Sequence, residues 1–110
     1  MDALTTILYD LGITPNLKGF ECIKYAVCLL MNDKDRYSQC ITKRLYPDVG
    51  KVLNCTAFQV ERNIRYCINK AIELDHGEIK TLIGISPYKN KLTNNEFLFA
   101  LTEVIIKEKT

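Results

Sequence analysis

The chain has 110 residues, of which 47% are hydrophobic and 25% are charged, so it is long enough for one folded domain and too apolar to be disordered. The formal net charge is only +2, but residues 41–70 carry six Lys and Arg side chains against two carboxylates. No apolar run is long enough to span a membrane, and the acidic start "MDALTTILYD" argues against a secretory signal, so we expect a cytoplasmic protein. Positive charge gathered in one segment favours a polyanionic partner.

The polar residues give no pattern typical of an enzyme or a metal site. The five cysteines form no close ligand pair and the only histidine is His76, so we expect no metal and no cofactor. We interpret the cysteines as small buried apolar residues in a reducing compartment, with a redox role for one of them as the alternative. Asp75 and His76 do not form a dyad, because adjacent residues of a helix do not face each other.

Helical spacing of apolar residues recurs along the chain, and strand-like alternation does not. Asp2 is expected to cap the first helix and Gly12 to end it. The segment "NDKDRYSQ", residues 32–39, is expected to be a polar break. The predicted helices cover residues 3–11, 19–31, 47–53, 56–75 and 78–84, and a last helix begins after Thr93. We therefore predict an all-α fold, a compact bundle of about six helices, in which residues 1–110 form a single domain.

The middle of the chain is expected to change direction twice. Ser38 is a candidate cap for a short turn or helix through residues 41–45, which Pro47 interrupts. Pro47 then suits the first turn of a new helix, because the N–H that proline lacks has no partner there anyway. Asn54 and Cys55 form a tight break before the next helix.

The longest predicted helix begins at Thr56, and Gln59 three residues later indicates a capping box. At about 100° per residue, one side of this helix carries an apolar stripe of Val60, Ile64, Cys67, Ile68 and Ala71. The opposite side carries Phe58, Arg62, Arg65 and Asn69, with Tyr66 beside them. An exposed Phe58 would indicate a protein contact, and the simpler interpretation is that it packs beneath the first turn of its own helix.

A short helix containing Gly50, a tight break and a longer helix make the layout of a helix-turn-helix. Arginine reads guanine through two hydrogen bonds to O6 and N7, each such pair giving about 1–3 kcal/mol of discrimination. The candidate base contacts are Gln59, Glu61, Arg62, Arg65 and Tyr66. The candidate phosphate contacts are Lys43, Arg44, Lys51, Thr56 and Asn69. The simpler alternative is an ordinary packed helix pair whose arginines are merely solvated.

The late segment "ISPYKNKL", residues 85–92, is expected to be a loop. Lys89 and Lys91 in it are interpreted as solvated, with phosphate contact as the alternative. Thr93 and Glu96 repeat the capping-box spacing at the start of the last helix. The apolar stripe of that helix is interpreted as core rather than as a dimer surface.

Three stretches carry a family resemblance: "LGITPNLKGF", "ITKRLYPDVGKVLNCTAFQVERNIRYCINKA" and "TNNEF". Through them the chain resembles the C-terminal DNA-binding effector domain of the stage zero sporulation protein A family, from about Leu4 to Lys107. The resemblance implies a six-helix domain whose helix from about Thr56 reads a guanine-containing promoter box. It implies base contacts for Arg62 and Arg65, and contacts of the region after Glu78 with a sigma subunit of RNA polymerase. Self-association on tandem DNA sites is also implied.

The chain departs from the family pattern at three positions of this helix. Phe58 stands where the family commonly has a small polar residue, Gln59 where it has arginine, and Tyr66 where it has histidine. We expect a related but shifted box preference and a lower affinity. No phospho-accepting receiver domain is expected within these residues. The alternative function is an interaction module that binds sigma factor or a full-length relative without reading DNA.

Overall fold

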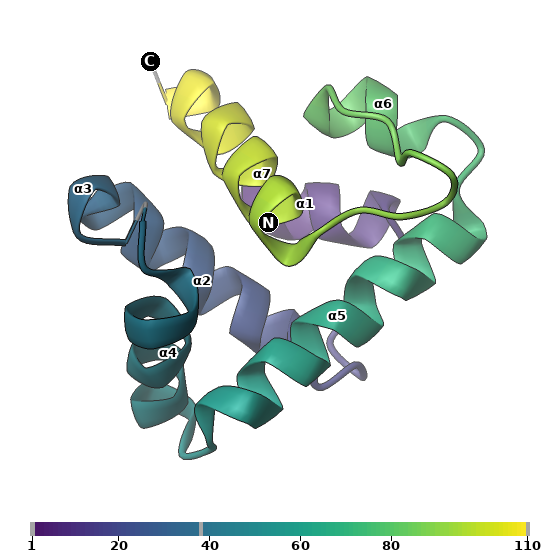
Figure 1. Ribbon diagram of the computed structural model, residues 1–110. Helices are drawn as coiled ribbons and strands as arrows, with labels where there is room; N and C mark the ends of the chain where they lie inside the picture. Colours follow the sequence, from purple (N-terminus) through teal and green to yellow (C-terminus); the bar gives the residue numbers. More distant parts are fainter. Residues whose placement is uncertain (1, 38, 110) are drawn as a thin grey trace.

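The structure is a computed structural model that describes residues 2–37 and 39–109 (Figure 1). Its elements in chain order are α1 (Ala3–Asp10), α2 (Gly19–Asn32), α3 (Lys34–Tyr37), a π-helical turn (Ile41–Leu45), α4 (Tyr46–Leu53), α5 (Ala57–Leu74), α6 (Glu78–Ile83) and α7 (Asn94–Lys109). No strand occurs in the described residues, where only Tyr88 and Lys91 pair as an isolated bridge. The predicted all-α class is confirmed, with seven α-helices in the described part of the chain where about six were predicted.

Helix α2 is central, because it contacts α1, α4, α5 and α7. In Figure 1, α5 runs diagonally along the lower side of the domain, and α7 crosses in front of α1. The buried apolar side chains of these helices form one continuous cluster. On α5 it contains the whole predicted stripe: Val60, Ile64, Cys67, Ile68 and Ala71 are at most 1% exposed. None of the described helices is long and apolar enough to cross a membrane.

The predicted helix starts are confirmed by their hydrogen bonds. Asp2 Oδ1 accepts from the backbone amide three residues later at 2.7 Å. At the start of α5, the amide of Thr56 donates to Gln59 Oε1 at 2.8 Å and the amide of Gln59 donates to Thr56 Oγ1 at 3.0 Å. Thr93 and Glu96 make the same reciprocal pair before α7, at 2.9 and 3.0 Å. These bonds satisfy amides that have no partner inside their helices.

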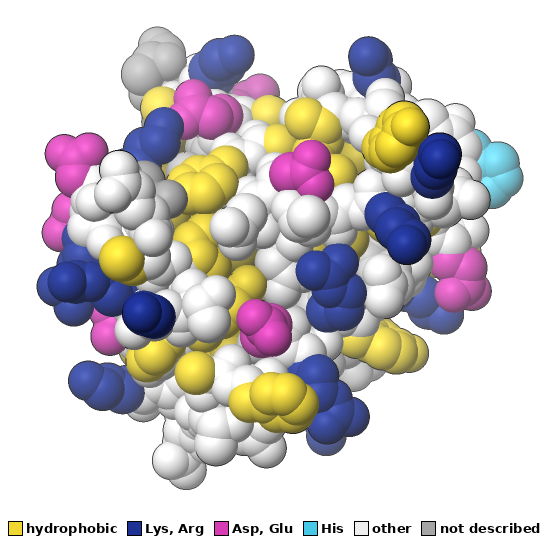
Figure 2. Space-filling view, in the orientation of Figure 1, with side chains coloured by type: hydrophobic (Ala, Val, Ile, Leu, Met, Phe, Trp, Pro, Cys, Tyr) yellow, Lys and Arg dark blue, Asp and Glu magenta, His cyan; other side chains and the backbone are white. Residues whose placement is uncertain are grey.

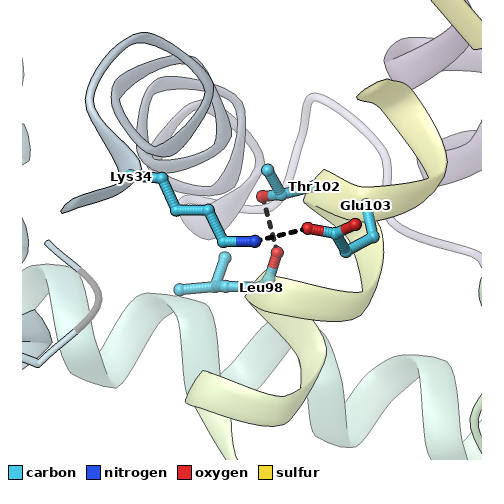
Figure 3. A network of polar contacts seen from close by, with 4 residues as sticks. All are labelled: Lys34, Leu98, Thr102 and Glu103. Atoms are coloured by element: carbon cyan, nitrogen blue, oxygen red, sulfur yellow. Dashed lines mark hydrogen bonds and ion pairs between the residues drawn. The ribbon is translucent and has the colours of Figure 1, made fainter. Parts of the chain in front are cut away.

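The expected polar break at residues 32–39 is confirmed at Asp33, where α2 ends, but it is wrong for Lys34–Tyr37, which forms α3. Contacts distant in sequence hold this short helix. Tyr37 is buried, and its hydroxyl donates to Asp48 Oδ2 at 2.6 Å. Lys34 reaches Glu103 on α7 at 2.6 Å, as Figure 3 shows beside the Thr102 hydroxyl that donates to the Leu98 carbonyl.

The interruption expected at Pro47 is also wrong. The chain stays helical from Ile41 to Leu53, and only its hydrogen-bonding register changes, from π to α, at Tyr46. Proline supplies no N–H, so a change of register costs least beside it. Pro47 lies in the first turn of α4, as predicted. Ser38, the expected cap of this segment, lies outside the described residues.

Two glycines mark places where backbones approach closely. A Cβ on Gly50 would lie 2.4 Å from the carbonyl oxygen of Cys55, which agrees with the expected close approach in the α4–α5 pair. A Cβ on Gly19 would lie 2.2 Å from the carbonyl oxygen of Asn63 and 2.6 Å from Cys67 Sγ. Helix α2 therefore crosses α5 with almost no space between their backbones.

The cysteines do not share one environment. Cys22 and Cys67 are buried, and burial raises the pKa of each thiol to about 11, so both stay protonated and unreactive. Cys40 and Cys55 are half-buried. The expectation of burial is wrong for Cys28, which is exposed. At about 100° per residue, it lies roughly 140° around α2 from the buried Ile23, away from the core.

Candidate nucleic-acid interface

All ten residues predicted to contact DNA have exposed side chains. Figure 2 shows Lys and Arg side chains over α5 and over the segment that leads to α7, on the same face of the domain. The exposed residues are Lys43, Arg44, Lys51, Thr56, Gln59, Glu61, Arg62, Arg65, Tyr66 and Asn69. The outer row of α5 is therefore available to a partner while its inner stripe is buried in the core.

A three-residue turn joins α4 to α5. Asn54 reverses the chain in the left-handed conformation, with φ of 58°, which asparagine tolerates better than most residues. The amide of Cys55 donates back to the carbonyl of Gly50 at 2.9 Å, so the turn is closed. Val49 and Val60, one from each helix, are fully buried. The orientation of α5 is thus set by α4 on one side and by the crossing of α2 on the other.

Arg62 lies against an aromatic ring on the surface. Its guanidinium carbon is 5.9 Å from the centre of the Phe58 ring, within the range of a cation–π contact. Phe58 is 65% exposed, so the interpretation that it packs beneath its own helix is wrong. Tyr66 is 58% exposed and lines, with Arg62, a groove between α5 and residues 16–19.

Arg65 is exposed but tethered. Its Nη1 donates to the carbonyl oxygen of Leu92 at 2.9 Å, across 27 residues of sequence. The sequence placed Arg65 on the side of the helix opposite the apolar stripe, and this bond leaves four of its five N–H groups for a ligand. Leu92 is buried, so the bond fastens the segment before α7 to the middle of α5.

Asn94, the first residue of α7, contacts α5 one turn before Arg65. Its Nδ2 donates to the Tyr46 hydroxyl at 3.1 Å and to the backbone carbonyl of Glu61 at 3.3 Å. Burial raises the pKa of Tyr46, which is 2% exposed, so its hydroxyl stays protonated. Sequence analysis missed the role of Asn94, because nothing in "TNNEF" indicates its partners and the two contacts lie 48 and 33 residues away.

Eight of the ten candidates line separate surface grooves. Arg65 and Asn69 line one with the segment before α7, and Arg62 and Tyr66 line another. Lys51, Thr56 and Gln59 lie together around the α4–α5 turn, and Lys43 lies beside residues 39–42 and Asn95. The side-chain oxygens of Thr56 and Gln59 are already used by the capping box, which leaves the amide NH2 of Gln59 as a donor.

The described residues contain no group of three or more His, Cys, Asp or Glu side chains placed to hold a metal ion. The arrangement instead offers hydrogen-bond donors and positive charge along one helix. In a comparison with protein families, the model described as the C terminal of sporulation initiation factor Spo0A matches residues 4–105. The match covers nearly the whole chain and confirms the resemblance found in the sequence.

Proposed function

Because the chain belongs to the family of the C-terminal domain of sporulation initiation factor Spo0A, it is a DNA-binding sporulation-regulator domain, and we propose that it reads a guanine-containing promoter box through α5. Helices α4 and α5 would act as a helix-turn-helix, with α5 in the major groove. This family is a regulatory family rather than an enzyme family. The proposed partner is double-stranded DNA in the cytoplasm.

The observation that carries the proposal is the exposed row of polar donors on α5, opposite a fully buried stripe. Arg62 presents its guanidinium beside the Phe58 ring, and Arg65 keeps four N–H groups beyond its bond to Leu92. Each arginine suits a two-hydrogen-bond contact with guanine O6 and N7. Glu61 suits acceptance from cytosine N4.

The remaining candidates would position the domain on DNA. Lys43, Arg44 and Lys51 precede α5 and suit phosphate contacts, which set orientation without reading sequence. Thr56 caps the start of α5, Asn69 lies in its second half, and both suit the same role. Gln59 and Tyr66 would add base contacts beside those of Arg62 and Arg65. The departures at these two positions support a box preference related to that of the family but not identical.

Selection of bound sites from random DNA, followed by fluorescence anisotropy, tests the proposal. We expect one enriched guanine-containing box. Loss of one bidentate contact, in Arg62→Ala or Arg65→Ala, should cost about 1–3 kcal/mol and relax preference at one position of the box. Arg44→Ala is the matched control, because loss of a phosphate contact should weaken all sequences about equally. No enrichment by the intact chain, or unchanged selectivity in the double variant Arg62→Ala/Arg65→Ala, would refute the proposal.

A second function is favoured by the aromatic side chains beside Arg62. Phe58 and Tyr66 are both more than half exposed, and aromatic residues with arginine are enriched in protein interfaces. An interaction module would use this surface to bind a sigma subunit of RNA polymerase or a relative, without reading DNA. Contacts to a sigma subunit and self-association on tandem sites are also compatible with DNA reading. Absence of selective DNA binding, together with binding to purified sigma subunit that Phe58→Ser abolishes, would support the module.

A further inference from the structure

The segment between α6 and α7 contains a defined turn rather than a loose loop. Tyr88 and Lys91 exchange two backbone hydrogen bonds of 3.0 Å each. Between them, Lys89 and Asn90 are both left-handed, with φ of 51° and 61°, which is the pattern of a type I′ turn. Asparagine is common in such turns, but lysine is not. A lysine held in an unfavourable conformation at the tip of a tight turn suggests a functional requirement for its charge.

Two contacts fix the position of this turn beside α5. Leu92, the residue after the turn, accepts the hydrogen bond from Arg65 Nη1 at 2.9 Å. Asn94, two residues later, donates to the backbone carbonyl of Glu61 at 3.3 Å. The turn therefore stands at a set distance from the outer row of α5, on the same face of the domain (Figures 1 and 2).

The turn and α5 enclose a positively charged groove. Its residues are Arg65, Asn69, Tyr88, Lys89, Lys91, Leu92, Thr93 and Glu96. The one carboxylate, of Glu96, accepts from the amide of Thr93 at 2.9 Å and is thus committed to the cap of α7. Among the described residues, Arg65, Lys89 and Lys91 form no salt bridge. The groove thus holds three cationic side chains against one carboxylate, and none of the three is held in a salt bridge within the described chain.

The chemistry of this groove fits the backbone of nucleic acid. Phosphate oxygens accept hydrogen bonds from Lys, Arg, Asn and Tyr side chains, and all four types line the groove. Tyr88 is 75% exposed, and Lys89 Nζ lies 5.5 Å from the centre of its ring. The groove is also continuous with the outer row of α5 that is proposed to read DNA, because Arg65 belongs to both. An acidic peptide would fit the charge, but it would not explain this continuity.

We infer that Lys89 and Lys91 hold phosphates of the DNA strand that flanks the box, in the groove that Arg65 and Asn69 complete. The domain then contacts DNA through two elements, the helix α5 and the turn at residues 88–91. These elements are 14 residues or more apart in sequence. The inference rests on the proposed function, since it needs α5 on DNA. In this arrangement Arg65 also acts as a positioning residue, because its bond to Leu92 sets the distance between the turn and the helix.

The test compares Lys89→Ala/Lys91→Ala with Lys24→Ala/Lys80→Ala, which removes the same charge outside the groove. Anisotropy titrations use the full chain and a duplex carrying the selected box, at salt concentrations from about 50 to 200 mM. Each lost phosphate contact reduces the slope of log affinity against log salt concentration by about 0.9. The groove variant should therefore lose about 1.8 from this slope and bind roughly 10- to 60-fold more weakly near 0.1 M salt. The ranking of box sequences should not change. The control should stay within a few-fold of the unmodified chain.

A second variant separates binding from folding. Lys89→Asn removes the charge and replaces lysine with a residue that tolerates the left-handed conformation. We expect its melting temperature to rise while its DNA affinity falls, a combination that a purely structural lysine would not give.

The outcomes are distinguishable. If the intact chain selects no box, the proposed function and this inference both fail. If it selects a box and the groove variant behaves like the control, only this inference fails. A changed ranking of sequences in the groove variant would also overturn it, because the turn would then read bases rather than hold phosphates.

Discussion

The crossing of α2 over α5 gives the strongest prediction about stability. Gly19→Ala places a methyl group 2.2 Å from the Asn63 carbonyl oxygen and 2.6 Å from Cys67 Sγ. Alanine is the better helix former, and on propensity alone the change would stabilise by up to about 1 kcal/mol. The clash is with backbone, which has no rotamer to change, so the helices must separate by roughly 1 Å and lose up to half of the dispersion energy at the contact.

We expect the clash to dominate. Overpacking costs about 1–3 kcal/mol, and at the upper end of that range Gly19→Ala lowers the free energy of unfolding by about 2–3 kcal/mol. For a chain of this length, that corresponds to a fall in melting temperature of roughly 10 °C. Urea and thermal unfolding followed by circular dichroism measure both quantities.

Two further variants test the physical reason. Gly84→Ala also replaces a glycine, but no atom lies within 4 Å of the added methyl group, so only its positive φ of 77° matters and the cost is about 1 kcal/mol. In Gly19→Ala/Cys67→Ala the sulfur is gone but the Asn63 carbonyl remains, so stability is not restored. A Gly19→Ala variant as stable as the unmodified chain, or a double variant that recovers, would refute a backbone-to-backbone contact at this crossing.

Two other predictions concern the polar contacts that hold α4 in place. Asn94→Ala removes the donor to the buried Tyr46 hydroxyl and should lower the free energy of unfolding by about 1–3 kcal/mol. In a double-mutant cycle, the variant Asn94→Ala/Tyr46→Phe should lose less stability than the two single variants together. The hydroxyl of Tyr37 lowers the pKa of Asp48 from 3.8, so Asp48 contributes stability that is present above this value and is lost as pH falls through the lowered pKa. Asp48→Asn should therefore destabilise the domain most near neutral pH and least below pH 3.8, and a difference that does not change with pH in urea titrations would contradict this assignment.

Three sets of contacts within the chain fix the backbone around α5. The capping box fixes the first turn of α5, the α4–α5 turn fixes its approach, and the Arg65–Leu92 bond fixes the segment before α7. A domain built in this way would meet DNA with its side chains already placed, which reduces the conformational entropy lost on binding.

The sequence by itself determined the helix starts and the buried helix faces, because both depend on residues that are close together in the chain. The caps at Asp2, Thr56 and Thr93 were predictable because a side-chain acceptor and its amide lie only three residues apart. The buried stripe of α5 and its exposed opposite row follow from the helical repeat alone. Two of the three motifs that carry the family resemblance contain the caps at Thr56 and Thr93, and the longer of these two also contains the stripe of α5.

Only the tertiary structure decided the contacts between distant residues. Helix α3 forms in a polar stretch because the buried Tyr37 donates a hydrogen bond to Asp48 and because Lys34 donates one to Glu103, 69 residues away in sequence. The pairing of Arg65 with Leu92, which brings Lys89 and Lys91 beside the outer row of α5, has no local signature either. Such contacts depend on how the helices pack, and neither hydrophobic spacing nor capping patterns encode that arrangement locally.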